Sequence, residues 1–162
     1  MSLYGPEYWM KKAIALAKSA ALNNEVPVGA VVVLDNEIIG QGSNGPIHRH
    51  DPTAHAEIQA LQQAAHNIGN YRLVNADLYV TLEPCAMCAG ALVHSRIRHL
   101  YFGALEAKSG AVVSNIRLLE QPSMNHRVEV SGGIMSECCS AIISDFFARR
   151  RAEKKALKNS LQ

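Results

Sequence analysis

Two cysteines three residues apart carry the clearest chemical signal in this chain. Cys85 and Cys88 stand in the stretch EPCAMC, directly behind a proline. At positions i and i+3 of a helix, their side chains would share one face. A thiol near a helix N-terminus has a lowered pKa, which favours the thiolate. Such a pair can act as a redox couple, as half of a structural zinc site, or as part of a catalytic metal site.

A structural zinc site needs four protein ligands, usually from a second closely spaced pair. The remaining cysteines of the sequence, Cys138 and Cys139, are adjacent and would point to different faces of a helix. We therefore interpret them as core or boundary thiols, because free cysteine is commonly buried.

The stretch TAHAE supplies a third metal ligand, His55, and a carboxylate two residues later, Glu57. An Asp-Pro pair just before it predicts a helix start, so both side chains would lie near a first turn and could face one site. One imidazole and two thiolates suit zinc, and three protein ligands leave one position for water. We therefore expect one zinc ion per chain at His55, Cys85 and Cys88, with iron as an open alternative. Glu57 would accept a proton from the bound water.

The elements that must position these side chains follow from the hydrophobic pattern. Helices are expected at 7–23, 51–68, 85–95 and from 135 onward, with a helical turn at 115–119. Strands are expected at 28–34, 38–44, 77–82, 99–104 and 127–133, the first two forming a hairpin. Residues 45–52 and 105–110 are expected as loops. This alternation predicts an α/β fold, a three-layer α/β/α sandwich with a five-stranded mixed sheet flanked by helices.

Composition favours one globular domain over residues 1–162. The hydrophobic fraction is 48% and the charged fraction 19%, and no apolar run approaches the ~20 residues that span a bilayer. The first eight residues lack the basic and apolar segments of a secretory signal. Four cysteines in such a chain argue against a disulfide framework. We expect a reducing, cytoplasmic location and no membrane association.

Charge is concentrated at the C-terminal end. Residues 145–162 contain six Lys or Arg and two acidic residues, so they carry +4, whereas the whole chain carries +2. A basic helical tail over about residues 148–162 could bind phosphates, or it could be a solvated last helix. Charge alone leaves both interpretations open.

Several further stretches accompany the metal pattern. They are EVPVGAV, RHDPTAHAEI, NYRL, LYVTLEPCAMCAGA, HSRI, MNHRVE and SDFFARRR. The His-x-Glu and Pro-Cys-x-x-Cys combination is typical of zinc-dependent deaminases. With the additional stretches, the chain resembles the bacterial tRNA-specific adenosine deaminases of the cytidine deaminase superfamily, from about Glu7 to about Arg151.

The resemblance implies a fold, an activity and a set of roles. It implies a cytidine deaminase-like fold, a homodimer, and a hydrolase that converts the wobble adenosine of an arginine tRNA anticodon loop to inosine. His55, Cys85 and Cys88 match the zinc ligands, and Glu57 matches the proton shuttle. Asn44 matches the asparagine that hydrogen-bonds the target nucleoside.

The resemblance also implies RNA contacts outside the metal site. Glu106 and Lys108 would lie in a loop that approaches the RNA backbone, and Phe146 and Phe147 match an aromatic pair near the substrate groove. Glu106 stands where the family often has aspartate, and residues 111–115 are bulkier than usual. His48 is an additional loop imidazole.

Two other functions remain open at this point. One is a deaminase of a free base or nucleoside (guanine, cytosine or adenine), which would use the same metal chemistry. The other is a zinc-stabilised RNA-binding module, which would need a fourth protein ligand such as His48 or His50. The carboxylate of Glu57 argues against the module, because a closed structural site needs no proton shuttle. Otherwise His48 and His50 are either exposed loop residues or neighbours of the RNA.

Overall fold

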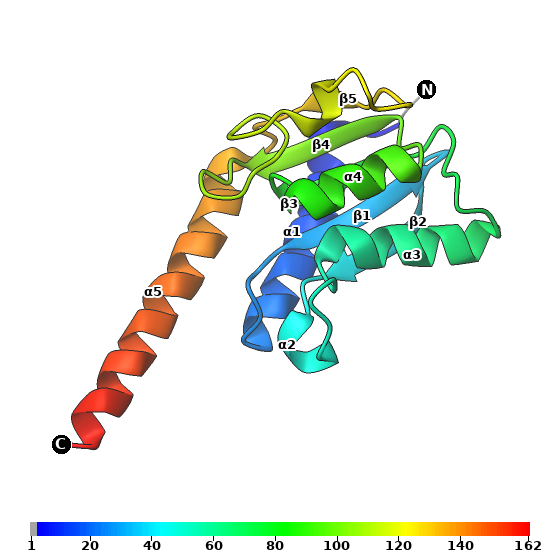
Figure 1. The fold of residues 1–162 in the computed structure, drawn as a ribbon. Coiled ribbons are helices and arrows are strands. Elements are labelled where there is room, and N and C mark those ends of the chain that lie inside the picture. The colour runs from blue at the N-terminus through cyan, green and yellow to red at the C-terminus, as the bar shows by residue number, and fades with distance from the viewer. Residues whose placement is uncertain (1–2) are drawn as a thin grey trace.

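A mixed sheet forms the centre of the protein (Figure 1). The structure, a computed structural model, describes residues 3–162, and within them the sheet has five strands in the order β2-β1-β3-β4-β5. The strands are β1 (Gly29–Leu34), β2 (Glu37–Ser43), β3 (Asp77–Leu82), β4 (His99–Ala104) and β5 (Glu129–Ser131). β1 is antiparallel to β2 and β3, whereas β3, β4 and β5 are parallel. The predicted five-stranded mixed sheet is confirmed.

Helices cover both faces of this sheet, as predicted. α1 (Pro6–Leu22) and the start of α5 (Ser136–Ser160) share one face, and α3 (Ala56–Ile68) and α4 (Ala86–His94) lie on the other (Figure 1). Successive side chains of β1 alternate between the two cores: Val32 packs with the α3 and α4 side, and Val31 and Val33 pack with Trp9 of α1. β1 is therefore buried on both faces, which is why its sequence is a continuous apolar run.

Two glycines of β2 let α3 lie unusually close to the sheet. A Cβ atom at Gly40 would lie 2.2 Å from the carbonyl oxygen of Ala60, and one at Gly42 would lie 2.3 Å from that of Ala56. Any larger residue at either position would push α3 outward. The N-terminus of α3, which carries His55, is thereby fixed against the sheet.

The start of α3 differs from the sequence prediction. The helix begins at Ala56 rather than near Asp51. The carboxylate of Asp51 instead accepts hydrogen bonds from the backbone N–H (2.8 Å) and the hydroxyl (2.7 Å) of Thr53. This local turn delays the helix, because an Asp side chain that binds the backbone two residues on competes with helix formation.

Three smaller elements also differ from the prediction. The expected loop at 45–52 contains a one-turn helix, α2 (Pro46–Arg49), and the turn expected at 115–119 is the 3₁₀ helix η1 (Leu118–Glu120). β5 is shorter than expected at both ends, and its C-terminal end lies before Gly133, whose φ of +84° is incompatible with extended backbone.

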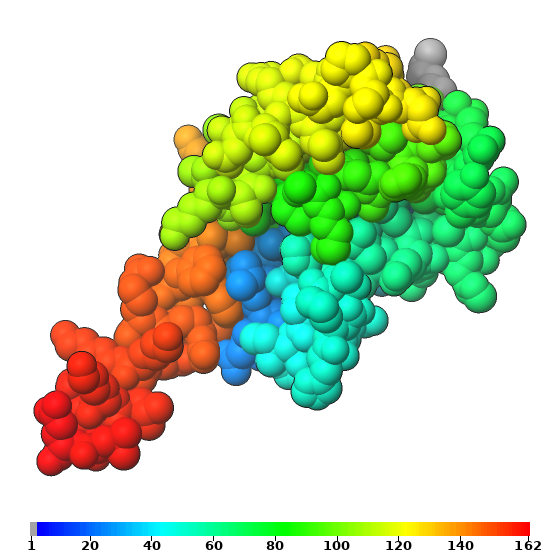
Figure 2. All heavy atoms as spheres, in the orientation of Figure 1, coloured from blue at the N-terminus to red at the C-terminus, as the bar shows by residue number. Residues whose placement is uncertain are grey.

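The last helix extends far beyond the sheet. α5 is 25 residues long, and its C-terminal half projects away from the rest of the protein (Figures 1 and 2). Phe146 is buried, whereas every residue from 147 to 162 is exposed. Across residues 3–162, none of the helices is long and apolar enough to cross a membrane.

Candidate active site

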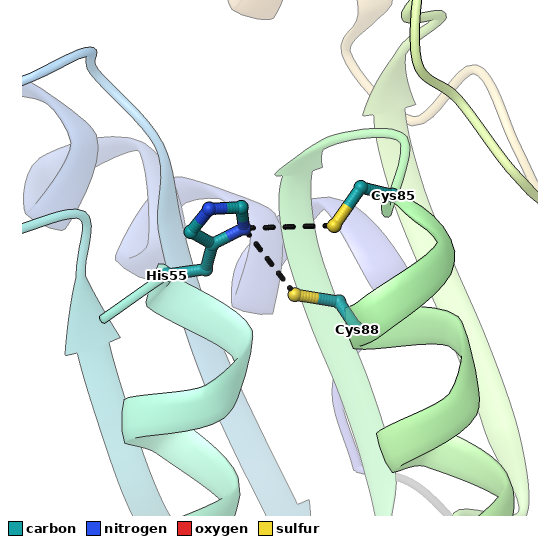
Figure 3. A group of neighbouring side chains, drawn as sticks. All are labelled: His55, Cys85 and Cys88. Carbon is teal, nitrogen blue, oxygen red and sulfur yellow. Dashed lines mark hydrogen bonds between the residues drawn. The ribbon is translucent and has the colours of Figure 1, made fainter. Parts of the chain in front are cut away.

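Three potential metal ligands meet where two helices begin (Figure 3). His55 is the N-cap of α3, and Cys85 is the N-cap of α4, with Cys88 in the first turn. The Nδ1 atom of His55 lies 3.6 Å from the Sγ atom of Cys85 and 3.6 Å from that of Cys88. The three donor atoms all lie within 4.8 Å of one another. The structure thus brings together the residues that sequence spacing singled out.

The backbone at both N-caps explains this convergence. His55 has φ of −73° and ψ of 154°, and Cys85 has φ of −75° and ψ of 177°, so each residue is extended just before its helix starts. This conformation lets His55 and Glu57, two residues apart, face one site, whereas a regular helix would separate them. Pro84, which is fully buried, fixes the chain between β3 and α4.

The donor set fits a zinc ion. Zinc binds thiolate at about 2.3 Å and imidazole at about 2.0–2.1 Å, so tetrahedral ligands would place nitrogen and sulfur about 3.6 Å apart. That separation matches both distances observed here. Hydrogen bonds from Cys88 and His55 lower the pKa of Cys85 to about 3, and the bond to Cys85 raises the pKa of Cys88. The same contact with Cys85 raises the pKa of His55.

Glu57 lies beside the three donors but is not one of them. Its side chain is buried, with 4% of the residue exposed. Burial is the main reason that the pKa of Glu57 rises to about 6, and the negative charge of Cys85 adds to the effect. A carboxyl group with a pKa near neutrality can both accept and release a proton at physiological pH.

A small cavity of about 220 Å³ joins these residues. It is lined by Val26, Val28, Asn44, His55, Glu57, Leu82, Glu83, Cys85, Glu106 and Ser109. A larger cavity of about 740 Å³ lies between β4, β5 and the start of α5, but its lining contains no His or Cys. The smaller cavity is the better candidate, because it alone of the two is lined by metal donors, His55 and Cys85, and by the buried carboxylate.

The other predicted site residues divide into two groups. Asn44 and Glu106 line the cavity with the metal donors. Lys108, Phe146 and Phe147 do not, although the N–H of Lys108 donates to the carboxylate of Glu106 (3.0 Å). Phe146 lines a separate shallow cavity between α1 and α5, and Phe147 is 42% exposed.

The two loop histidines do not join the donor group. Among residues 3–162 that group comprises one His and two Cys, so His48 and His50 supply no fourth ligand. The Nδ1 atom of His48 instead lies 2.9 Å from a carboxylate oxygen of buried Glu25.

Sequence reasoning missed Glu83, which is only 2% exposed and lines the cavity. Burial opposes its ionisation, but hydrogen bonds from the hydroxyl of Ser114 and from the N–H groups of Val113, Ser114 and Glu106 lower its pKa to about 2. The available signal was an acidic residue directly between an apolar strand and the Pro-Cys pair. An acid at that position has no polar partner nearby in sequence, so its partners must come from elsewhere in the fold.

Comparison with known proteins defines the family. A family model described as MafB19-like deaminase matches residues 6–151. A tRNA-specific adenosine deaminase from Haemophilus influenzae is 52% identical over 157 residues, covering 96% of this chain and 91% of the relative. A solved tRNA:A34 deaminase, studied for A-to-I editing at the wobble position of transfer RNA, matches with a TM-score of 0.81 and 44% identity, covering 83% of this chain and 98% of the other.

A more distant structure shows how widely the fold is shared. A guanine deaminase from Nitrosomonas europaea matches with a TM-score of 0.73 over 91% of this chain and 87% of the other, at 21% identity. That similarity concerns the fold alone. The family match and the close relatives go further: this chain belongs to the MafB19-like deaminases and, among them, to the enzyme family of the tRNA-specific adenosine deaminases, as its motifs predicted.

Proposed function

We propose that this chain converts the wobble adenosine of a tRNA anticodon loop to inosine by zinc-dependent hydrolytic deamination, with an arginine tRNA as substrate. The observation that carries the proposal is the buried carboxylate of Glu57 beside the donor group of His55, Cys85 and Cys88, with Glu57, His55 and Cys85 lining one small cavity. The names of the close relatives support tRNA adenosine as the substrate.

The metal group and Glu57 divide the chemistry. His55, Cys85 and Cys88 would hold the zinc ion, which when bound supplies a water molecule acidic enough to react at neutral pH. Glu57 would take a proton from the attacking water as oxygen adds to C6 of adenine, and would deliver it to N1. It would then carry the proton of the new C6 hydroxyl to the amino group, which leaves as ammonia as C6 becomes a carbonyl. A pKa of about 6 suits both proton transfers.

The size of the cavity supports a proposal for how the base is held. At about 220 Å³ it is sized for a base rather than for a stretch of RNA, so the target must leave the anticodon stack. An anticodon loop opens at low cost, because its bases are not paired. The amide of Asn44, which lines this cavity, is proposed to hydrogen-bond the nucleoside.

RNA outside the cavity would meet several further residues. Glu106 and Lys108 are proposed to approach the RNA backbone, and Phe146 and Phe147 are proposed to lie near the substrate groove. The resemblance to the family also supports a homodimer and a cytoplasmic location. The exposed basic end of α5 supports electrostatic attraction to the phosphates.

Inosine mapping tests the proposal. The purified chain would be incubated with an anticodon stem-loop and, separately, with free adenosine, guanine and cytosine. We expect inosine at the wobble position of the RNA and much slower turnover of the free compounds. Turnover of a free base at a rate equal to that of the RNA would instead support the alternative deaminase function.

A further inference from the structure

One buried carboxylate holds a whole loop in place beside the candidate active site. Oε1 of Glu83 accepts a hydrogen bond from the N–H of Glu106 (3.1 Å) and another from the hydroxyl of Ser114. Oε2 accepts from the N–H groups of Val112 (3.1 Å), Val113 (2.8 Å) and Ser114 (2.9 Å). Both ends of the segment 106–114 therefore bind the same side chain.

This segment forms part of the cavity wall. Glu106 and Ser109 line the cavity that contains His55 and Glu57, and both belong to the loop between β4 and η1. The loop has no helix or strand of its own over residues 105–117. Its geometry therefore depends on hydrogen bonds such as those to Glu83, because regular secondary structure does not define it.

The packing around Glu83 is tight as well as polar. A Cβ atom at Gly110 would lie 2.5 Å from Oε1 of Glu83 and 2.5 Å from the carbonyl oxygen of Glu106. Only glycine lets the loop backbone approach the carboxylate so closely. The carboxylate also suits its partners in charge, because several N–H groups that point at one anion bind it more strongly than they would bind a neutral group.

We propose that Glu83 is a positioning residue for the RNA substrate. From the end of β3 it fixes segment 106–114, and so determines how Glu106 and Ser109 meet the nucleotides around the target base. This proposal rests on the proposed function, because it assigns the wall to an RNA substrate. The chemical role of Glu83 is to accept hydrogen bonds from the protein, whereas proton transfer belongs to Glu57.

The test uses Glu83→Gln in the full chain, with Glu120→Gln as a matched control. Glutamine keeps the size of Glu83 but presents an NH₂ group to N–H donors. Glu120 lies nearby in η1, is exposed, and pairs with Arg117. Hydrogen exchange of segment 106–114, metal content, and kcat and KM for an anticodon stem-loop would be measured for both variants.

For Glu83→Gln we expect amide exchange in segment 106–114 to accelerate by about tenfold or more, because buried acceptors of those N–H groups are lost. KM should rise by about tenfold, whereas kcat at saturating RNA should change by less than about threefold and metal content should stay that of the wild type. Glu120→Gln should match the wild type in all four measurements.

Two results would overturn the proposal. Unchanged exchange in segment 106–114 would show that Glu83 does not hold the loop, and faster exchange with an unchanged KM would show that the loop does not position the RNA. Should Glu83→Gln fail to fold, Ser114→Ala and Gly110→Ala disturb the same contact and take its place. If the wild type itself turns over no RNA, the proposed function fails. Hydrogen exchange of segment 106–114 in Glu83→Gln still decides whether Glu83 holds the loop, because that measurement needs no RNA.

Discussion

At the scale of residues, the site follows from a few local spacings. A Cys-x-x-Cys pair at a helix start and a His-x-Glu pair at another were enough to predict which side chains meet, because N-cap backbone orients them in a regular way. Glu83 was not predictable in this manner. Its partners, from Glu106 to Ser114, lie 23 to 31 residues away in sequence, so only the fold reveals them.

The role of Glu57 predicts a clean separation of metal binding from catalysis. Glu57→Gln should keep the metal, because Glu57 is not in the donor group, but kcat should fall by at least ~10²-fold with the loss of the proton shuttle. Metal analysis and inosine formation on a stem-loop check both parts. Full metal-dependent activity in Glu57→Gln would rule out this role.

Removal of a metal ligand should differ from this in its effect on metal content. Cys88→Ala should lose both the metal and the activity, because two donors bind zinc far more weakly than three. Cys138→Ala is the matched control, since Cys138 is an exposed cysteine on α5 and should change neither. Stoichiometric metal in Cys88→Ala would contradict the assigned ligand set.

At the scale of elements, the sheet was the most predictable part. The bounds of β3 and β4 agree with the sequence prediction, because each is a short apolar run between clear turn signals. The segment from Asn44 to His55 was less predictable. Its α2 helix depends on Glu25, whose carboxylate accepts from the N–H groups of Ile47 (3.1 Å) and His48 (2.9 Å) across 22 residues or more of sequence.

This contact predicts a stability that depends on pH. Burial opposes ionisation of Glu25, but hydrogen bonds from His48 and Ile47 outweigh it and lower the pKa of Glu25 below its usual 4.5. A group whose pKa is lower in the folded state stabilises the protein above its unfolded pKa, and that stability is lost as the pH falls through the folded pKa.

Glu25→Gln should therefore reduce the free energy of unfolding at pH 7 by about 1–3 kcal/mol, because the buried donors lose a charged acceptor. The difference from the wild type should shrink as the pH falls below about 4.5. Urea denaturation of both proteins at several pH values measures it. A difference that stays constant from pH 7 to pH 3 would contradict the assigned contact.

At the scale of the whole molecule, α5 combines an anchored start with an extended end. Arg149 ties the helix to α1 through hydrogen bonds to the carbonyl oxygen of Ala21 (3.0 Å) and the side chain of Asn24 (3.1 Å). Every residue beyond it is exposed, and Figure 2 shows this end of the helix projecting from the rest of the protein. The charge of the sequence predicted a basic tail. How far this tail extends from the rest of the protein is visible only in the structure.

This projecting end predicts a change in RNA affinity rather than in chemistry. Replacing Lys154, Lys155 and Lys158 together by Gln should weaken stem-loop binding and reduce its salt dependence, because fewer counterions are released from the RNA. kcat at saturating RNA should be unchanged. Binding titrations at several salt concentrations test this, with Lys11 and Lys12 of α1 replaced by Gln as the control. If stem-loop binding has the same salt dependence in the tail variant and the wild type, the tail does not contact the RNA phosphates and is a solvated helix.

The most direct test of the central claim, a three-donor metal site that leaves one position for water, is zinc X-ray absorption spectroscopy on protein purified without chelators. We predict about one zinc ion per chain with two sulfur ligands, one imidazole nitrogen and one further light atom that exchanges with solvent. A coordination sphere closed by four protein ligands, or native protein that binds no metal, would contradict the claim.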